Sequence, residues 1–245
     1  MRRNNKKFIS KFILILTAIL IAGCRSKSFI YPEIGTLQTK EASLVPLTNK
    51  TVVVLPFNDN RPKAENLNLY FLYMLPIAPF GYGKYEYPEK ATWFTSISSF
   101  DFNPSIDMAR AASTNFQNSK LFKDVIFSNT PGEYKSDYTL EGQINSLLYT
   151  GRRFSYGTSY FSYILWTLGA PMGTSFNCVS ITLCLKDKNQ NVLWQYSSEK
   201  EDYTVQWMYS PYADCSMYTA LTNKALENAV TDLYNKLRTN PGFIQ

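Results

Sequence analysis

The residue whose surroundings most clearly indicate chemistry is Cys24, a thiol at the end of an ordered amino-terminal pattern. The pattern begins with basic residues and no acid: Arg2, Arg3, Lys6, Lys7 and Lys11. An apolar run from Phe12 to Ile21 follows, broken only by Thr17, and Ala22 and Gly23 precede the cysteine. This order is typical of an export signal that is removed by cleavage. The ten-residue run is too short to cross a bilayer as a helix, which takes about 20 residues.

The stretch from Leu20 to Cys24 resembles the lipobox of bacterial lipoprotein precursors. The resemblance implies that the Cys24 sulfur receives a diacylglycerol, that residues 1–23 are cut off as a signal peptide, and that the new amino terminus is acylated, for example with palmitate. Several acyl chains anchor a protein stably, because each buried methylene contributes about 0.8 kcal/mol. Arg25 stands where an aspartate would favour retention at the inner membrane in Gram-negative sorting. The expected location is therefore the outer membrane, facing the periplasm.

The rest of the sequence offers little for catalysis. The chain has no histidine, which excludes serine or cysteine triads with histidine, histidine metal sites and histidine pH switches. It also has no phosphate-binding glycine loop and no metal-ligand spacing. We therefore expect a protein that is not an enzyme and that uses no cofactor or metal.

Three further cysteines, Cys178, Cys184 and Cys215, can be paired or free. On one strand, Cys178 and Cys184 would share a face about 20 Å apart, at roughly 3.3 Å per residue, which is beyond disulfide reach. A disulfide would therefore join Cys215 to one of the other two. Three buried free thiols are the equally weighted alternative.

The basic character of the chain lies mainly in its amino-terminal segment. The whole sequence carries a net charge of +6, but five basic residues precede Cys24, so the mature chain carries about one positive charge. A nucleic-acid-binding surface needs clustered positive charge. We therefore expect no nucleic-acid partner.

Two polar clusters are candidates for a local site. The loop Asn58-Asp59-Asn60-Arg61 could form a carboxylate–guanidinium site, or it could satisfy only its own backbone and a helix end, which is the commoner role. Glu199, Glu201 and Asp202 flank Lys200, and this pattern favours a solvated strand end.

Two apolar excursions, Tyr70–Gly83 and Tyr160–Gly173, are the most informative internal features. Each begins with aromatic residues and ends in a proline- and glycine-containing turn. They can form a surface for a protein partner, a lipid or the bilayer interface, or pack on each other as a satellite core. Prolines interrupt both, which disfavours membrane-inserted hairpins. The possible interface residues are Tyr70, Phe71, Tyr73, Met74, Phe80, Tyr82, Tyr160, Phe161, Tyr163 and Trp166.

The remaining segments predict the elements that position these features. Apolar alternation and β-branched runs indicate strands, and apolar residues at helical spacing indicate helices, the first of them capped by Asn103 and Pro104. The expected strands are 51–57, 124–128, 138–147, 177–186 and 192–196, and the expected helices are 104–119 and 216–238. We therefore predict a tether at 24–50 and one α+β domain at 51–240, with a mixed sheet of about five strands and two main helices on one side.

Phrases within this domain resemble a module of bacterial envelope proteins. They are Val53-Val54-Leu55-Pro56-Phe57 with its polar turn, Ser119–Val125, and Val192-Leu193-Trp194. Similar phrases occur in the curli-secretion lipoproteins, the amino-terminal domain of TolB and auxiliary lipoproteins of ABC transport systems, and the excursions are closer to uncharacterised envelope lipoproteins. The resemblance implies a non-catalytic binding or accessory subunit of an envelope transport or secretion assembly, with a protein partner. An oligomeric or pore-type subunit and a lipid- or ligand-binding lipoprotein are the alternatives.

Overall fold

The computed structural model describes residues 27–28, 46–63, 66–90, 100–101, 103–209, 217–240 and 242. Cys24 and Cys215 lie outside these residues, so lipidation at Cys24 and the pairing of Cys215 stay predictions. Residues 46–50, the last of the predicted tether, are bound to the domain, because the Leu47 and Thr48 amides donate to the Lys120 and Leu121 carbonyls at 3.0 and 3.1 Å.

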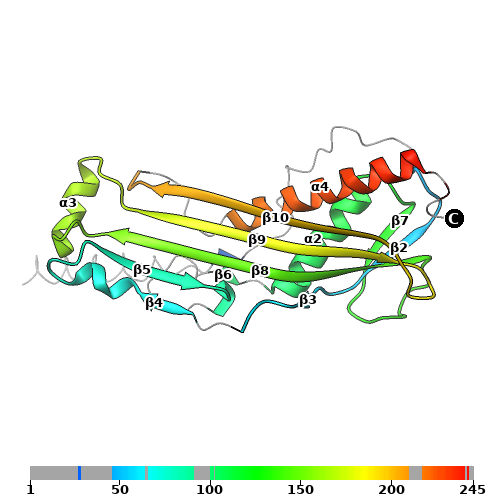
Figure 1. Cartoon of the computed structure of the whole chain (residues 1–245), viewed down its shortest axis with the longest axis horizontal. Helices are drawn as coiled ribbons and strands as arrows, with labels where there is room; N and C mark the ends of the chain where they lie inside the picture. The colour runs from blue at the N-terminus through cyan, green and yellow to red at the C-terminus, as the bar shows by residue number, and fades with distance from the viewer. Residues whose placement is uncertain are drawn as a thin grey trace, which may run out of the picture.

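One eight-stranded mixed sheet runs the length of an elongated molecule (Figure 1). Its central order is β10-β9-β8-β2-β7, in which β2 is parallel to β7 and β8, and β8, β9 and β10 are antiparallel. These strands are β2 (Thr51–Val54), β7 (Asp124–Phe127), β8 (Tyr138–Phe154), β9 (Gly173–Lys186) and β10 (Val192–Gln206). The short strands are β3 (Asn58–Asp59), β4 (Leu67–Leu69) and β5 (Phe80–Tyr85), and a separate pair joins β1 (Lys27–Ser28) to β6 (Phe100–Asp101).

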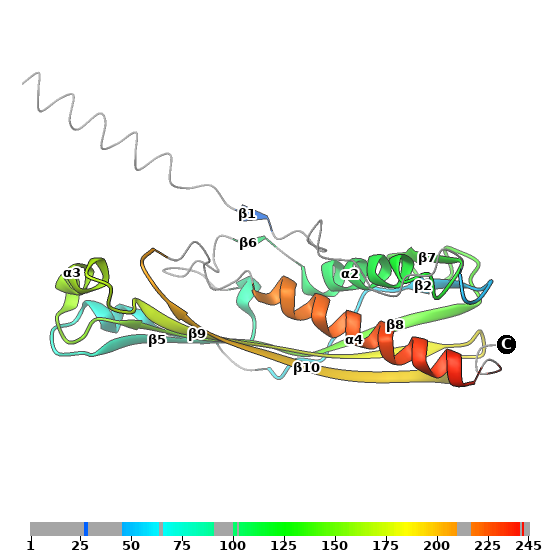
Figure 2. The same ribbon diagram turned by 90° about the horizontal axis from the view of Figure 1, so that it is seen from above.

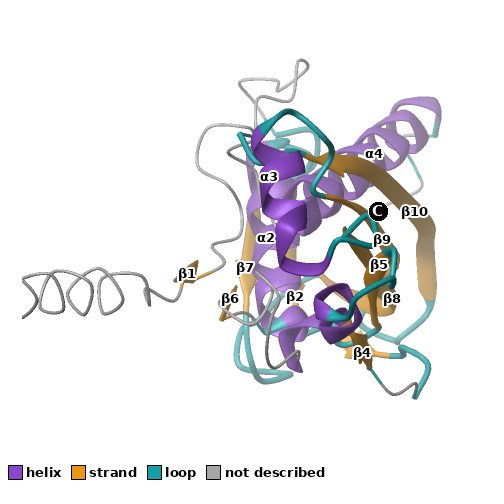
Figure 3. Cartoon of the chain, turned by 90° about the vertical axis from the view of Figure 1, so that its left-hand side faces the viewer, coloured by secondary structure: helices purple, strands orange, loops and turns teal. Residues whose placement is uncertain are grey.

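Three α-helices lie on one side of this curved sheet (Figures 2 and 3). They are α2 (Pro104–Asn118), α3 (Ser162–Thr167) and α4 (Met217–Thr239), with short 3-10 helices η1 (Tyr70–Met74), η2 (Pro88–Lys90) and η4 (Ser159–Phe161). The predicted α+β class and the two main helices are confirmed, whereas the sheet has more strands than the five expected. In the part of the chain that the structure describes, no helix is long and apolar enough to cross a membrane.

The start of α2 is set by a different side chain from the one expected. Asn103 has an extended backbone and Pro104 occupies the first helical turn, as predicted, but the Asn103 side chain makes no capping hydrogen bond. Instead, the Asp107 carboxylate accepts a hydrogen bond from the Asn103 amide at 2.7 Å. An acid in the first turn also interacts favourably with the helix dipole.

The core lies between the sheet and the two long helices. Alanines on the inner faces let α2 and α4 approach closely, and Trp194 fills the space beside them. Its indole is stacked on Tyr196 and meets Phe116 edge to face, and its Nε1 donates to Asp232 at 2.8 Å. The buried Trp194 indole, with its N–H bonded to Asp232, therefore fixes the position of α4 on β10.

Strand β8 extends seven residues beyond its predicted end, and a β-bulge interrupts the alternation within it. The bulge lies between Ile144 and Ser146 and shifts the side-chain alternation by one residue. Leu140 and Ile144 face the helices before the bulge, and Leu147 and Tyr149 are the buried residues after it. Because the bulge changes which residues face the helices, a single alternation of apolar and polar residues does not describe the whole strand.

The hydroxyl of Tyr85 gives a pH-dependent prediction. It is buried and has no hydrogen-bond partner among the described residues, and burial raises the pKa of Tyr85 from 10.0 to about 12. Between these values the unfolded chain releases this proton while the folded chain keeps it, so stability falls as the pH rises from 10 to 12. We expect Tyr85→Phe to retain stability at pH 7 and to reduce the alkaline loss, measured by urea unfolding. Tyr203→Phe, at an exposed ring, is the control, and an unchanged alkaline loss in Tyr85→Phe would contradict the assignment.

Candidate functional site

The two apolar excursions, separate in the sequence, meet at one end of the molecule (Figure 1). The Ile77 amide donates to the Gly157 carbonyl at 3.2 Å, and the Ser155 and Tyr156 amides both donate to the Pro79 carbonyl. The Ser159 hydroxyl donates to the Met74 carbonyl. These bonds join the first excursion to residues 155–159, which lead directly into the second. The Tyr160 hydroxyl also donates to the Met74 sulfur at 3.3 Å, so the two excursions form a single structure.

Buried aromatic residues hold this end of the molecule on the sheet. Tyr70 lies over three glycines of β5 and β8 (Gly81, Gly83 and Gly151), and its hydroxyl is 3.2 Å from that of Tyr149. Trp166 of α3 is buried, and its Nε1 donates to the Phe154 carbonyl at 3.1 Å. Glycine is required under Tyr70, because a side chain would occupy the space of the ring or its backbone.

Gly81 is therefore a sensitive position. A Cβ atom there would lie 2.3 Å from the Tyr70 carbonyl oxygen, a backbone atom that cannot rotate away. We expect Gly81→Ala to lower the free energy of unfolding by about 1–3 kcal/mol, the usual cost of overpacking. Urea unfolding measures the change, with Lys84→Ala at an exposed position of the same strand as the control. Equal stability of both variants would show that η1 is not clamped against β5.

Around these buried anchors, eight large apolar side chains of the two excursions are at least 46% exposed, and we call this set the apolar tip. Ile77 is 88% exposed and Leu168 is 79% exposed, each next to a turn. The members of the apolar tip are Phe71, Leu75, Ile77, Tyr160, Phe161, Tyr163, Ile164 and Leu168. Exposed apolar groups concentrated in this way on a folded domain are typical of interaction surfaces.

The charge around the apolar tip is positive. No charged residue occurs between Asn66 and Gly83 or between Phe154 and Leu185. The charged residues that border these stretches are Glu65 and Lys84 for the first and Arg153 and Lys186 for the second, and Arg152 adjoins Arg153. The Arg152 guanidinium lies 5.5 Å from the Phe80 ring centroid and the Arg153 guanidinium 5.9 Å from that of Trp166, which places both cations beside the aromatic groups.

The structure separates the ten predicted interface residues into two roles. Phe71, Phe80, Tyr160, Phe161 and Tyr163 are exposed, Tyr73, Met74 and Tyr82 are half-buried, and Tyr70 and Trp166 are buried. The buried pair therefore supports the surface rather than forming it. The aliphatic residues Leu75, Ile77, Ile164 and Leu168 were missed. Three of them, Leu75, Ile77 and Leu168, adjoin Pro76 or Gly169, and that position was the signal that could have identified them.

The Asp59–Arg61 loop forms a structural clamp. The Arg61 guanidinium is buried, with bonds of 2.8 Å to both Asp59 carboxylate oxygens and of 2.7 and 3.1 Å to those of Glu89. It also donates to the Glu86 carbonyl and lies 4.3 Å from the Tyr87 ring centroid. Burial alone would lower the pKa of Arg61, but its bonds to Asp59 and Glu89 raise it. This fully engaged cation ties residues 59–61 to residues 86–89 and matches the structural alternative.

A thiol–carboxylate group occupies the sheet face that points away from the helices. The Cys178 sulfur and one carboxylate oxygen each from Glu199 and Glu201 lie within 4.8 Å of one another, and such a set could hold a metal ion. Burial, and then the carboxylates of Glu199, Glu201 and Glu86, raise the pKa of Cys178 to about 11, so the thiol is protonated at neutral pH. Glu199 and Glu201 are within β10 rather than at a solvated strand end, which corrects that expectation.

This group was missed because its members are distant in the sequence. The turn at residues 187–191 joins β9 to β10 and sets a register that places Cys178 directly opposite Glu201. Counting outward from that turn would pair Cys178 with Lys200, because a bulge between Val192 and Trp194 shifts the register by one residue, so this group left no signal in the sequence. Cys178 is a buried free thiol and Cys184 a half-buried one, so no disulfide joins the two, as expected, while the alternatives for Cys215 lie outside the described residues.

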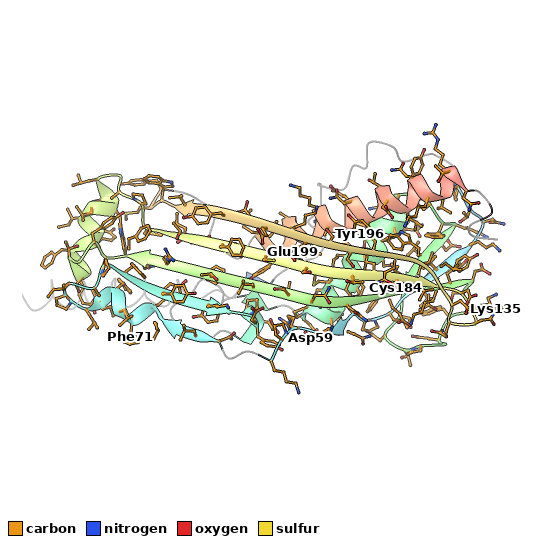
Figure 4. The ribbon with its side chains drawn as sticks, viewed as in Figure 1. Asp59, Phe71, Lys135, Cys184, Tyr196 and Glu199 are labelled. Atoms are coloured by element: carbon orange, nitrogen blue, oxygen red, sulfur yellow. The ribbon has the colours of Figure 1, made fainter. Side chains whose placement is uncertain are left out.

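A cavity of about 540 Å³ lies at the opposite end of the sheet from the apolar tip. It is lined by residues of mixed polarity, including Val53, Leu55, Asp137, Glu141 and Lys188. Figure 4 shows Lys135, which also lines this cavity, at the far end of the molecule from Phe71. The ligand-binding alternative predicted a pocket walled by the two excursions. Neither excursion contributes a residue to the lining of this cavity.

Comparison with known proteins gives no family for this chain. No protein-family model matches it, and no curated protein matches it. Among solved structures, it is similar to a DUF330 protein from Xanthomonas campestris, with 13% identity, coverage of 85% of this chain and 89% of the other, and a TM-score of 0.35. It is similar to lipoprotein GNA1162 from Neisseria meningitidis, with 16% identity, coverage of 78% and 99%, and a TM-score of 0.27. A putative lipoprotein from Caulobacter crescentus matches with 15% identity, coverage of 44% and 69%, and a TM-score of 0.25.

Proposed function

We propose that the protein is a bacterial envelope lipoprotein, held on a membrane through lipid on Cys24, that acts without catalysis as a binding or accessory subunit. Its apolar tip is the binding surface. The outer membrane, facing the periplasm, is the proposed location. The resemblance of the domain to envelope modules extends the proposal to a transport or secretion assembly.

The observation that carries this proposal is the merging of two distant segments into one exposed apolar end. A folded chain gains nothing in stability from leaving Ile77 and Leu168 in water, because burial of such side chains contributes about 1.5–3 kcal/mol each. The tip nevertheless has a specific structural support, which consists of three glycines and two buried aromatic residues. A rigid support beneath side chains that remain exposed favours a role for these side chains in binding another molecule.

Site-specific photo-crosslinking in cells tests the proposal. A photoreactive amino acid is placed at Phe161, in the apolar tip, or at Lys135, an exposed control position at the other end (Figure 4). We expect adducts that form from position 161 and not from position 135. An adduct with a second copy of the chain would favour the oligomeric alternative. Absence of tip-specific adducts would count decisively against a binding role for the tip.

A further inference from the structure

We propose that the apolar tip contacts the headgroup region of the same bilayer that holds the lipid on Cys24. This inference rests on the proposed function, because it names the surface that the tip binds. The tip then acts as a second attachment point, and the two points together fix how the long sheet lies relative to the membrane.

The first argument is the place where the lipid joins the fold. Cys24 precedes Lys27 by three residues, and three extended residues span about 10 Å. Residues 27–28 form β1, which pairs in parallel with β6, just before the start of α2. The lipid is therefore attached close to the β1–β6 pair, and the effective tether is much shorter than residues 24–50.

The second argument is that the anchor and the tip share one side of the molecule. Strands β1 and β6 and helix α3 all lie on the α2 side of the sheet (Figures 2 and 3). A bilayer that holds the Cys24 lipid therefore faces the side from which α3 projects. Helix α3 and the adjoining η4 carry Tyr160, Phe161, Tyr163 and Ile164, each more than half exposed. This part of the apolar tip thus lies on the side that faces the membrane.

The third argument is chemical. Tyrosine rings suit the boundary between headgroups and acyl chains, because they offer an apolar body and a polar hydroxyl. Arg152 and Arg153 lie beside Phe80 and Trp166, and cations beside an apolar surface are attracted to anionic lipids. The positive charge beside the tip and its aromatic composition both match an anionic bilayer surface.

The shape of the tip favours a fluid partner over a protein. Ile77 has a left-handed backbone, with φ of +75°, and Leu168 directly precedes Gly169, with φ of +97°, so both aliphatic side chains project from turns. A protein partner would need a pocket shaped for each projecting side chain, whereas a bilayer accepts single apolar groups without matching their shape.

Depth-dependent fluorescence quenching tests the inference on the full lipidated protein, reconstituted in vesicles of phosphatidylethanolamine and phosphatidylglycerol. Cys178, Cys184 and Cys215 are replaced by serine, and a polarity-sensitive fluorophore is attached at Leu168→Cys or, as the control, at Lys135→Cys. We expect brominated acyl chains to quench the label at position 168 several-fold more than the label at position 135. If Leu168→Cys alters the circular dichroism spectrum, Ile77→Cys takes its place.

Lipid charge provides the second arm. We expect quenching at position 168 to fall when phosphatidylcholine replaces phosphatidylglycerol, and to become insensitive to that change in the double variant Arg152→Gln, Arg153→Gln. Equally weak quenching at positions 168 and 135 in anionic vesicles overturns the inference.

The crosslinking experiment at Phe161 separates this failure from failure of the proposed function. A lipid adduct supports both proposals. A protein adduct, together with a water-exposed label at position 168, overturns the bilayer inference and retains the binding role. Absence of any tip-specific adduct, with the label in water, overturns both.

Discussion

A chain with Cys24→Ala is expected to accumulate as an uncut precursor without lipid. In lipoprotein precursors the cysteine sulfur is the attachment atom for the diacylglycerol, and alanine has no atom that can take its place. Because each buried methylene contributes about 0.8 kcal/mol, the loss of whole acyl chains removes the dominant membrane attachment. Incorporation of labelled palmitate is expected to fall to background, and mass spectrometry is expected to find residues 1–23 still present.

The matched control is Cys178→Ser, which removes a buried thiol outside the amino-terminal pattern. It should incorporate palmitate normally and lose its signal peptide. Retained palmitate in the Cys24→Ala chain, or cleavage after Gly23 in that chain, would be incompatible with the lipobox assignment.

Replacing Arg61 by methionine should give the largest loss of stability among the described residues discussed above. The side chain is only 2% exposed, and it is the cation shared by Asp59 and Glu89. Its removal leaves two carboxylates facing each other without a counter-charge, a change that typically costs about 3–5 kcal/mol. Urea unfolding of the purified protein measures this loss as a lower midpoint with an unchanged slope.

Two further variants test the reason for that loss. Adding Asp59→Asn and Glu89→Gln to Arg61→Met should recover part of the stability, because neutral partners need no counter-charge. Lys186→Met, which breaks the more exposed pair with Glu141, should change stability by no more than about 1 kcal/mol. An Arg61→Met loss as small as the Lys186→Met loss would mean that the clamp contributes little to the stability of the fold.

The fold class could be predicted from the sequence because its main elements carry strong local signals. Helix α4 has an apolar stripe at helical spacing, and β2 is a continuous β-branched run. Strands β8 and β10 were predicted too short for physical reasons. The bulge at 144–146 interrupts the alternation of β8, and the charged run from Glu199 to Asp202 lies inside β10, where an exposed edge tolerates it.

The candidate site was predictable only in part. The composition of the excursions identified both segments, because aromatic residues without charges are conspicuous in any window. Their meeting depends on contacts such as Ile77 with Gly157, which join residues 80 positions apart and leave no local trace in the sequence. The division between buried Tyr70 and exposed Phe71 also depends on the glycines of β5 and β8, and that pairing is a property of the sheet.

Amide hydrogen exchange of the lipidated protein tests the central claim, that the apolar tip is a contact surface, most directly. Exchange is compared between native envelope membranes and the same protein purified in detergent and transferred to a soluble amphiphilic polymer. The account predicts slower exchange in the membranes for residues 70–83 and 154–173, with no change at residues 129–137 around the cavity. Identical exchange of the tip segments in the two preparations would contradict it.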